Sequence, residues 1–164
     1  MSIQTIVEHL EKLYQLNESL LTLSKQKTEL VKKSQIDEFN ELLMKERKHA
    51  QAIEQVESKR VKLTDEWFQQ HAPNESEQTI SQLIELLEDE ALKGQLQEVY
   101  EKLIYNLADL KQQEALNQDL IQQSLQFIEL SMEMFQPQSK NINYDKTKDQ
   151  PNQKPNTSVF DSKA

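Results

Sequence analysis

The spacing of apolar side chains constrains this chain more than any other feature of its sequence. Between residues 3 and 135, apolar residues recur at intervals of three and four, which is the period of a helix rather than of a strand. The same stretch contains one glycine, Gly94, and one proline, Pro73. Because both residue types interrupt helices, their scarcity permits long helices. The sequence therefore predicts an all-α fold, an elongated antiparallel helical bundle or coiled coil of three long helices plus one short helix.

The predicted helices are separated by recognisable breaks. Ser34, followed three positions later by Asp37, is typical of the N-cap of a helix that begins near Gln35. Pro73 disfavours helix at the preceding residue and predicts a turn. The last helix, of about 45 residues, cannot be stable alone in water, so its apolar face is expected to pack on the first two helices. The predicted helices cover residues 3–31, 35–71, 78–87 and 91–135.

Polar residues interrupt the predicted seams between helices. Ser24 and Lys27 stand where the apolar stripe of the first helix should continue, so the seam is expected to shift or loosen there. In coiled coils such residues specify register and partner at some cost in stability, and Arg60 is expected to pair with Glu46 or Glu57. The polar residues placed on the seams are Asn17, Glu46, Arg60, Glu114 and Asn117.

Composition excludes several classes of function. With 19 basic and 28 acidic residues the chain carries a net charge of -9, which suits phosphate backbones poorly and predicts no nucleic-acid partner. A single glycine cannot build a phosphate-binding loop, and the absence of cysteine removes thiolate zinc sites and thiol nucleophiles. No segment approaches the ~18 apolar residues that span a bilayer. The chain is expected to be soluble and intracellular, without membrane insertion.

One motif resembles a metal site. Glu46 and His49 form a Glu-x-x-His, as used twice in di-iron helical bundles, but here the motif occurs once. The preferred interpretation is a surface histidine, with a metal-dependent bundle enzyme as a distant alternative. The 28 acidic residues are spread along the chain and single out no catalytic pair. We therefore expect no enzyme activity, no metal, no cofactor and no small-molecule substrate.

Residues 136–164 differ in character from the rest. They hold three of the four prolines and many Asn and Gln, so they predict a flexible C-terminal tail behind a helical domain of residues 1–135. The tail has five Lys against three Asp, a net charge of +2, and the helical domain has a net charge of -11. Isolated apolar residues in such a tail are either docking points or chance, and the sequence does not decide between them. They are Ile142, Tyr144, Val159 and Phe160.

The end of the last helix carries more apolar surface than one packing face requires. Two apolar stripes lie about 120° or more apart and together span roughly 200°, about twice the apolar face of an ordinary surface helix. Either a three- or four-helix bundle encloses both stripes, or the second stripe binds an external helix. The first stripe consists of Ile121, Leu125, Ile128, Met132 and Phe135. The second consists of Leu116, Leu120, Phe127, Leu130 and Met134.

The same region resembles the FlgN-type flagellar export chaperones. Residues 117–128 read NQDLIQQSLQFI and are similar to the pattern N-x-x-L-[L/I]-x-x-S-L-x-[F/Y]-I late in the long helix of that family. The tail, with Tyr144 between Asn143 and Asp145, also resembles the family. The resemblance implies a cytoplasmic, ATP-independent, non-enzymatic chaperone. Such chaperones bind hook-associated (hook–filament junction) proteins, prevent their premature assembly and deliver them to the cytoplasmic domain of the export gate.

The resemblance and the helix pattern together suggest site residues. An amphipathic cargo helix is expected to lie along the second stripe, with Leu116, Leu120, Phe127, Leu130 and Met134 as cargo-binding residues. The resemblance implies an export-gate contact for Tyr144, although the family's Tyr-Gly-x-x-Gly form is absent here. The main alternative is a self-associating coiled-coil scaffold without cargo, in which the second stripe makes a homodimer.

Overall fold

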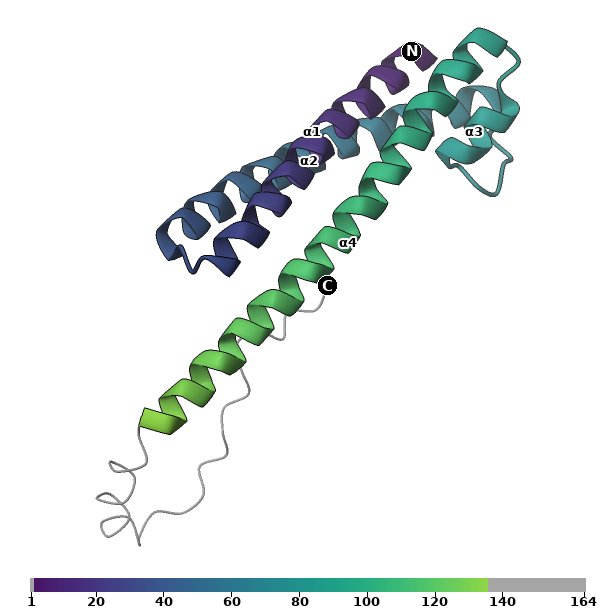
Figure 1. Ribbon diagram of the computed structural model, residues 1–164. Coiled ribbons are helices and arrows are strands. Elements are labelled where there is room, and N and C mark those ends of the chain that lie inside the picture. Colours follow the sequence, from purple (N-terminus) through teal and green to yellow (C-terminus); the bar gives the residue numbers. More distant parts are fainter. Residues whose placement is uncertain (1, 136–164) are drawn as a thin grey trace, which may run out of the picture. The chain divides into compact units, whose positions relative to one another are not determined.

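The computed structural model describes residues 2–135 of the chain, and all of its regular elements there are helices. The described part of the chain divides into two units, with the boundary between Ser124 and Leu125. The first unit holds three helices and most of a fourth, which continues into the second unit (Figure 1). The predicted all-α helical bundle is confirmed. The helices are α1 (Ile3–Lys32), α2 (Ile36–His71), α3 (Ile80–Leu86) and α4 (Glu90–Phe135).

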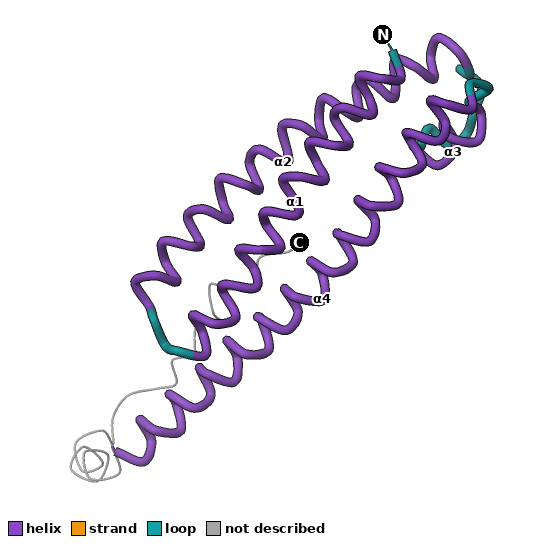
Figure 2. The backbone as a smooth tube through the Cα atoms, turned by 45° about the horizontal axis from the view of Figure 1, so that its top comes forward, coloured by secondary structure: helices purple, strands orange, loops and turns teal. Residues whose placement is uncertain are grey.

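A three-residue turn reverses the chain between α1 and α2 (Figure 2). Ser34 adopts a left-handed conformation with φ 54°, and its N–H donates to the carbonyl of Val31 at 3.2 Å. The N–H of Gln35 donates to the carbonyl of Leu30 at 3.1 Å. This is a Schellman closure of α1, which satisfies carbonyls that the helix end would otherwise leave unpaired. The prediction that Ser34 caps α2 is therefore wrong, and Gln35 occupies that position without a side-chain cap.

The main hydrophobic core lies where α1 and α4 begin and α2 ends. Phe68, Leu83 and Leu96, from α2, α3 and α4, are 0 % exposed and bring these three helices together. The short α3 starts at Thr79, whose hydroxyl accepts a hydrogen bond from the N–H of Gln82 at 3.2 Å. The core residues are Ile3, Ile6, Val7, Leu10, Leu13, Leu63, Phe68, Ile80, Leu83, Ile84, Leu96, Val99 and Leu103.

The opposite end of the α1–α2 hairpin is less buried than its sequence pattern predicts. Ile36 and Leu43 follow the helical period of the apolar positions in this helix, which predicts that they pack on a neighbouring helix, yet they are 70 % and 39 % exposed. Leu42 is buried instead, and it lies in a groove with Gln26 and Leu30 of α1. Neighbouring helical positions point about 100° apart, so packing on α1 turns Leu42 inward and Leu43 outward.

Within the first unit, α1 and α4 run parallel. Hydrogen bonds join residues of α1 to residues of α4 that are 85 to 93 positions later in the chain. In that register Lys32, the last residue of α1, lies level with about residue 122 of α4. Gly94 causes no break, since α4 continues through it. No helix within residues 2–135 is long and apolar enough to cross a membrane.

Candidate functional site

The C-terminal end of α4 exposes most of the second apolar stripe. Phe127, Leu130 and Met134 are 71 %, 60 % and 79 % exposed, and Leu116 is 47 % exposed. Leu120 is half-buried. Four of the five predicted cargo-binding side chains are thus open to solvent, and the fifth is partly covered.

The first stripe is also exposed beyond Ile121, which is half-buried. The expectation that the apolar face of the last helix packs on the first two helices is wrong at Ile128 and Phe135, which are 52 % and 88 % exposed. Leu125 and Met132 are also exposed, at 55 % each. Within the first unit, α1 ends at Lys32, and its hydrogen bonds to α4 reach as far as Asn117.

All the charged residues at this end of α4 are acidic. Between residues 112 and 135 the sequence has four acidic residues and no Lys or Arg. The acidic residues are Glu114, Asp119, Glu129 and Glu133. The hydroxyls of Ser124 and Ser131 donate to helix carbonyls four residues earlier, at 2.9 and 2.8 Å. Their donors are therefore engaged within the helix, and the surface offered to a partner is chiefly apolar with carboxylates at intervals.

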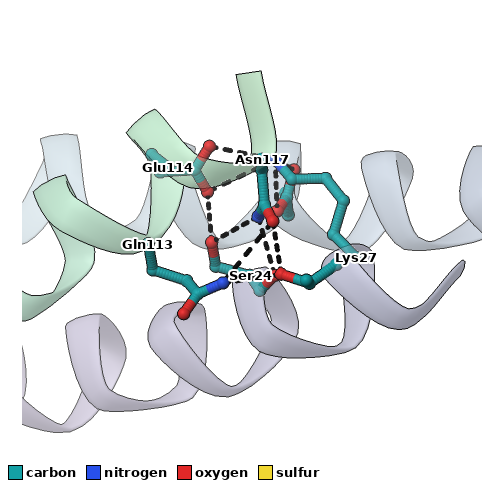
Figure 3. A network of polar contacts seen from close by, with 7 residues as sticks. Ser24, Lys27, Gln113, Glu114 and Asn117 are labelled. Carbon is teal, nitrogen blue, oxygen red and sulfur yellow. Dashed lines mark hydrogen bonds and ion pairs between the residues drawn. The ribbon is translucent and has the colours of Figure 1, made fainter. Parts of the chain in front are cut away.

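A buried ion cluster ties α4 to α1 and α2 just before this apolar end. The Lys27 ammonium lies 3.0 Å from a carboxylate oxygen of Glu46 and 3.0 Å from one of Glu114 (Figure 3). The Lys27 side chain is only 8 % exposed, and that of Glu46 15 %. Ser24 donates to the Glu114 carboxylate at 2.7 Å. Three helices thus converge on one cation.

Asn117 extends the cluster by one helical turn. Its side chain is almost fully buried, and its amide donates to the carbonyl and hydroxyl oxygens of Ser24 at 2.8 and 3.0 Å (Figure 3). Its amide oxygen accepts from the Thr28 hydroxyl, which in turn accepts from Gln113 at 2.6 Å. Because these bonds have fixed directions, they set both the register and the rotation of α4 on α1. Within the first unit, this rotation determines which α4 residues are exposed.

The sequence analysis found this cluster only in part. It placed Glu46, Glu114 and Asn117 on the seam, but it predicted loosening at Ser24 and Lys27, which are in fact buried. Glu46 pairs with Lys27, and Arg60 pairs with Glu57 instead. Their spacing could have predicted this burial, because Ser24, Lys27 and Thr28 follow the helical period of the buried apolar positions before them. The polar residues that hydrogen bonds connect in this cluster are Ser24, Lys27, Thr28, Glu46, Gln113, Glu114 and Asn117.

The Glu-x-x-His motif does not build a metal site in the described part of the chain. Glu46 points to Lys27, and the Nδ1–H of His49 donates to the carbonyl of Lys45 at 2.9 Å. Among residues 2–135, no group of three or more His, Asp or Glu side chains is placed to hold a metal ion.

Comparison with known proteins assigns the family. The sequence pattern of the family described as FlgN protein matches residues 1–152, which is most of the chain. The chain belongs to the FlgN family. FlgN proteins are chaperones of flagellum biogenesis, so this FlgN protein is a flagellar export chaperone in general terms. The family also implies that it binds flagellar proteins.

A curated relative supports the same relationship. It comes from Bacillus subtilis (strain 168), is described as uncharacterized protein YvyG, and is 38 % identical over 165 residues, covering 100 % of both chains. No solved structure matches this FlgN protein. The predicted gate residue Tyr144 falls inside the family match but outside the described residues.

Proposed function

We propose that this FlgN protein binds hook-associated proteins of the hook–filament junction through the C-terminal end of α4. It keeps them unassembled in the cytoplasm and delivers them to the cytoplasmic domain of the flagellar export gate. The observation that carries the proposal is the exposure of both apolar stripes on residues 125–135. An apolar surface of this kind marks a site for another protein. The action is binding and release, without an enzymatic step.

The recognition mode is helix against helix. An amphipathic cargo helix lays its apolar face on the second stripe, and α4 provides the anchors at helical spacing. Burial of about 400 Å² of apolar surface contributes about 10 kcal/mol at 25 cal/mol per Å². Loss of translational and rotational freedom and ordering of side chains offset much of this gain, so binding is reversible. Reversibility suits a chaperone that must release its cargo at the gate.

The composition of the surface fits several related cargo proteins better than a single rigid one. Met132 and Met134 are 55 % and 79 % exposed. Unbranched thioether side chains repack around different partner surfaces at low cost. The cargo-binding residues we propose are Leu116, Leu120, Phe127, Leu130 and Met134.

The gate contact is proposed for the tail, separately from the cargo site. Tyr144 is the residue that matches the family's tyrosine beyond the long helix. A tyrosine offers a large apolar ring and one hydroxyl, which together suit a transient contact. Placing the two contacts on different segments lets cargo and gate be bound at the same time.

A paired substitution tests the cargo site. Replacing Phe127 and Met134 with Ser should abolish co-purification of the hook-associated proteins of the same organism, because two exposed anchors are lost. The matched control replaces Ile104 and Tyr105, which are 47 % and 73 % exposed on the same helix, with Ser. We expect normal cargo binding in the control and unchanged helicity and melting in both variants. Equal loss of binding in both would refute the site.

Removal of the tail separates the two contacts. A chain ending at Gln136 should retain near-stoichiometric cargo and lose binding to the isolated cytoplasmic domain of the export gate. Replacing Tyr144 with Ala in the full chain should reproduce the second loss alone. If cargo binding disappears with the tail, the cargo site lies there instead of on α4.

A self-associating scaffold is the second candidate, and the same exposed stripes support it, since they could pair between two copies. Sedimentation of the purified full-length chain discriminates the two functions. A constitutive dimer that the Phe127 and Met134 substitutions dissociate would favour the scaffold, and a monomer would exclude it.

A further inference from the structure

The apolar end of α4 poses a problem for the chaperone when no cargo is bound. Seven large apolar side chains are more than half exposed within eleven residues. A contiguous apolar surface of this kind promotes non-specific association unless something covers it. The seven residues are Leu125, Phe127, Ile128, Leu130, Met132, Met134 and Phe135.

The chain itself supplies a segment long enough to cover this end. Residues 136–164 follow directly on Phe135, where the exposed surface ends. Residues 125–135 span about 16 Å of helix at 1.5 Å per residue. The 25 residues from Phe135 to Phe160 reach at most about 85 Å when fully extended. Any part of the tail can therefore be brought back along the exposed end.

Charge favours the tail over a second copy of the chain. Residues 125–135 carry two acidic residues, Glu129 and Glu133, and no basic residue, whereas residues 136–164 carry five Lys against three Asp. The tail and the helix end therefore attract each other. Two copies of residues 125–135 would instead bring four carboxylates together without one basic residue, which is unfavourable at an interface.

The tail also holds apolar residues suited to anchor it. Val159 and Phe160 are adjacent, and Lys154 precedes them by five positions. An apolar pair can bury on the exposed stripe while lysines of the tail approach Glu129 and Glu133. We infer that residues 136–164 fold back onto residues 125–135 of α4, with Val159 and Phe160 as anchors, and cover the apolar surface until a partner displaces them.

The effect of the folded-back tail on cargo binding rests on the proposed function. The contact between the tail and residues 125–135 does not depend on it. A chaperone whose site is open for a fraction of the time has its apparent affinity for cargo reduced by that fraction. The tail then acts as an internal competitor, which disfavours weak, unspecific partners and aids release of cargo. Salt weakens the electrostatic part of the contact and opens the site.

Methionine oxidation measures the cover directly, without any cargo. Thioether oxidation by peroxide depends on solvent access and is resolved residue by residue by mass spectrometry. Met132 and Met134 report on the covered surface, and Met44, which is 64 % exposed on α2, serves as the internal reference. The full-length chain is compared with Val159→Ser/Phe160→Ser and with the control Asn152→Ser/Asn156→Ser, which changes the tail without removing apolar residues.

We expect Met132 and Met134 to oxidise about threefold faster in the Val159 and Phe160 variant, if the tail covers the surface for about two-thirds of the time. Met44 and the control should keep the wild-type rates. Equal rates at Met132 and Met134 in all three proteins overturn the inference. Protection that persists in the variant but disappears on dilution also overturns it, because a second copy is then the cover.

A measurement of cargo affinity tests the folded-back tail and the proposed cargo site separately. The same variant should bind a hook-associated protein about threefold more tightly than the full-length chain does. Faster oxidation without any cargo binding by either protein would uphold the cover and refute the cargo site. Cargo binding by both proteins with unchanged oxidation would uphold the cargo site and refute the cover.

Discussion

Replacing Lys27 with Met tests whether the ion cluster holds α4 on the hairpin. The substitution removes a cation whose side chain is 8 % exposed and leaves Glu46, at 15 % exposed, without its partner. Truncating one partner of a buried pair costs about 3–5 kcal/mol. The lower end applies here, because Glu114 is 44 % exposed and can be hydrated when Lys27 is gone. We therefore expect a loss of about 3 kcal/mol in the free energy of unfolding.

Urea unfolding followed by circular dichroism at 222 nm measures this loss. With a slope of about 2 kcal/mol per M, the midpoint should fall by about 1.5 M. The double substitution of Lys27 and Glu46 with Met removes both buried charges and leaves Glu114 bound to Ser24. Its midpoint should return to within about 0.5 M of wild type, because replacing a buried pair by apolar side chains is close to neutral.

Lys102 offers a matched control. It forms an ion pair with Glu98 on the surface of α4, where both side chains are more than half exposed. The hydrogen bond and the charge of Glu98 raise the pKa of Lys102, yet water screens the pair. Lys102→Met should leave the urea midpoint unchanged. If Lys27→Met behaves like Lys102→Met, or if the double variant stays as unstable as the single one, the reasoning about a stranded buried carboxylate is refuted.

Two further substitutions test the fold elsewhere. Ser34→Gly should raise the free energy of unfolding by about 0.5–1 kcal/mol and increase the melting temperature, because glycine adopts the left-handed conformation without the steric cost of a Cβ; a lower melting temperature would contradict the Schellman closure. Phe68→Ala should cost about 3–5 kcal/mol in urea unfolding, because the side chain is 0 % exposed and leaves a cavity between α2, α3 and α4; a loss below about 1 kcal/mol would contradict its central position in the core.

Local pattern was sufficient to predict the helices, since helical period and breakers are properties of neighbouring residues. The helix expected over residues 35–71 is observed as Ile36–His71, and the one expected over 91–135 as Glu90–Phe135. Pro73 lies in the connection that it predicted. The error at Ser34 arose because a serine is locally favoured as an N-cap, whereas the backbone hydrogen bonds that close α1 place this residue in the left-handed position that ends that helix.

Burial along the helices was predicted less well, because it depends on which neighbour lies opposite. The choice between Leu42 and Leu43 is decided by contact with α1, which a single helix pattern does not contain. Lys27 looks like an interruption of the seam in sequence. In the fold it is buried, because Glu46 and Glu114 approach it from two other helices.

The sequence by itself determined that the chain is helical, where its long helices run, and that the end of the last helix carries two apolar stripes. Only the tertiary structure decided that both stripes are exposed over residues 125–135. Within the first unit, the tertiary structure also decided that α1 ends at Lys32, level with about residue 122 of α4. Periodicity records which side chains share a face, whereas burial requires another helix at the same height, and that is a property of the assembled fold.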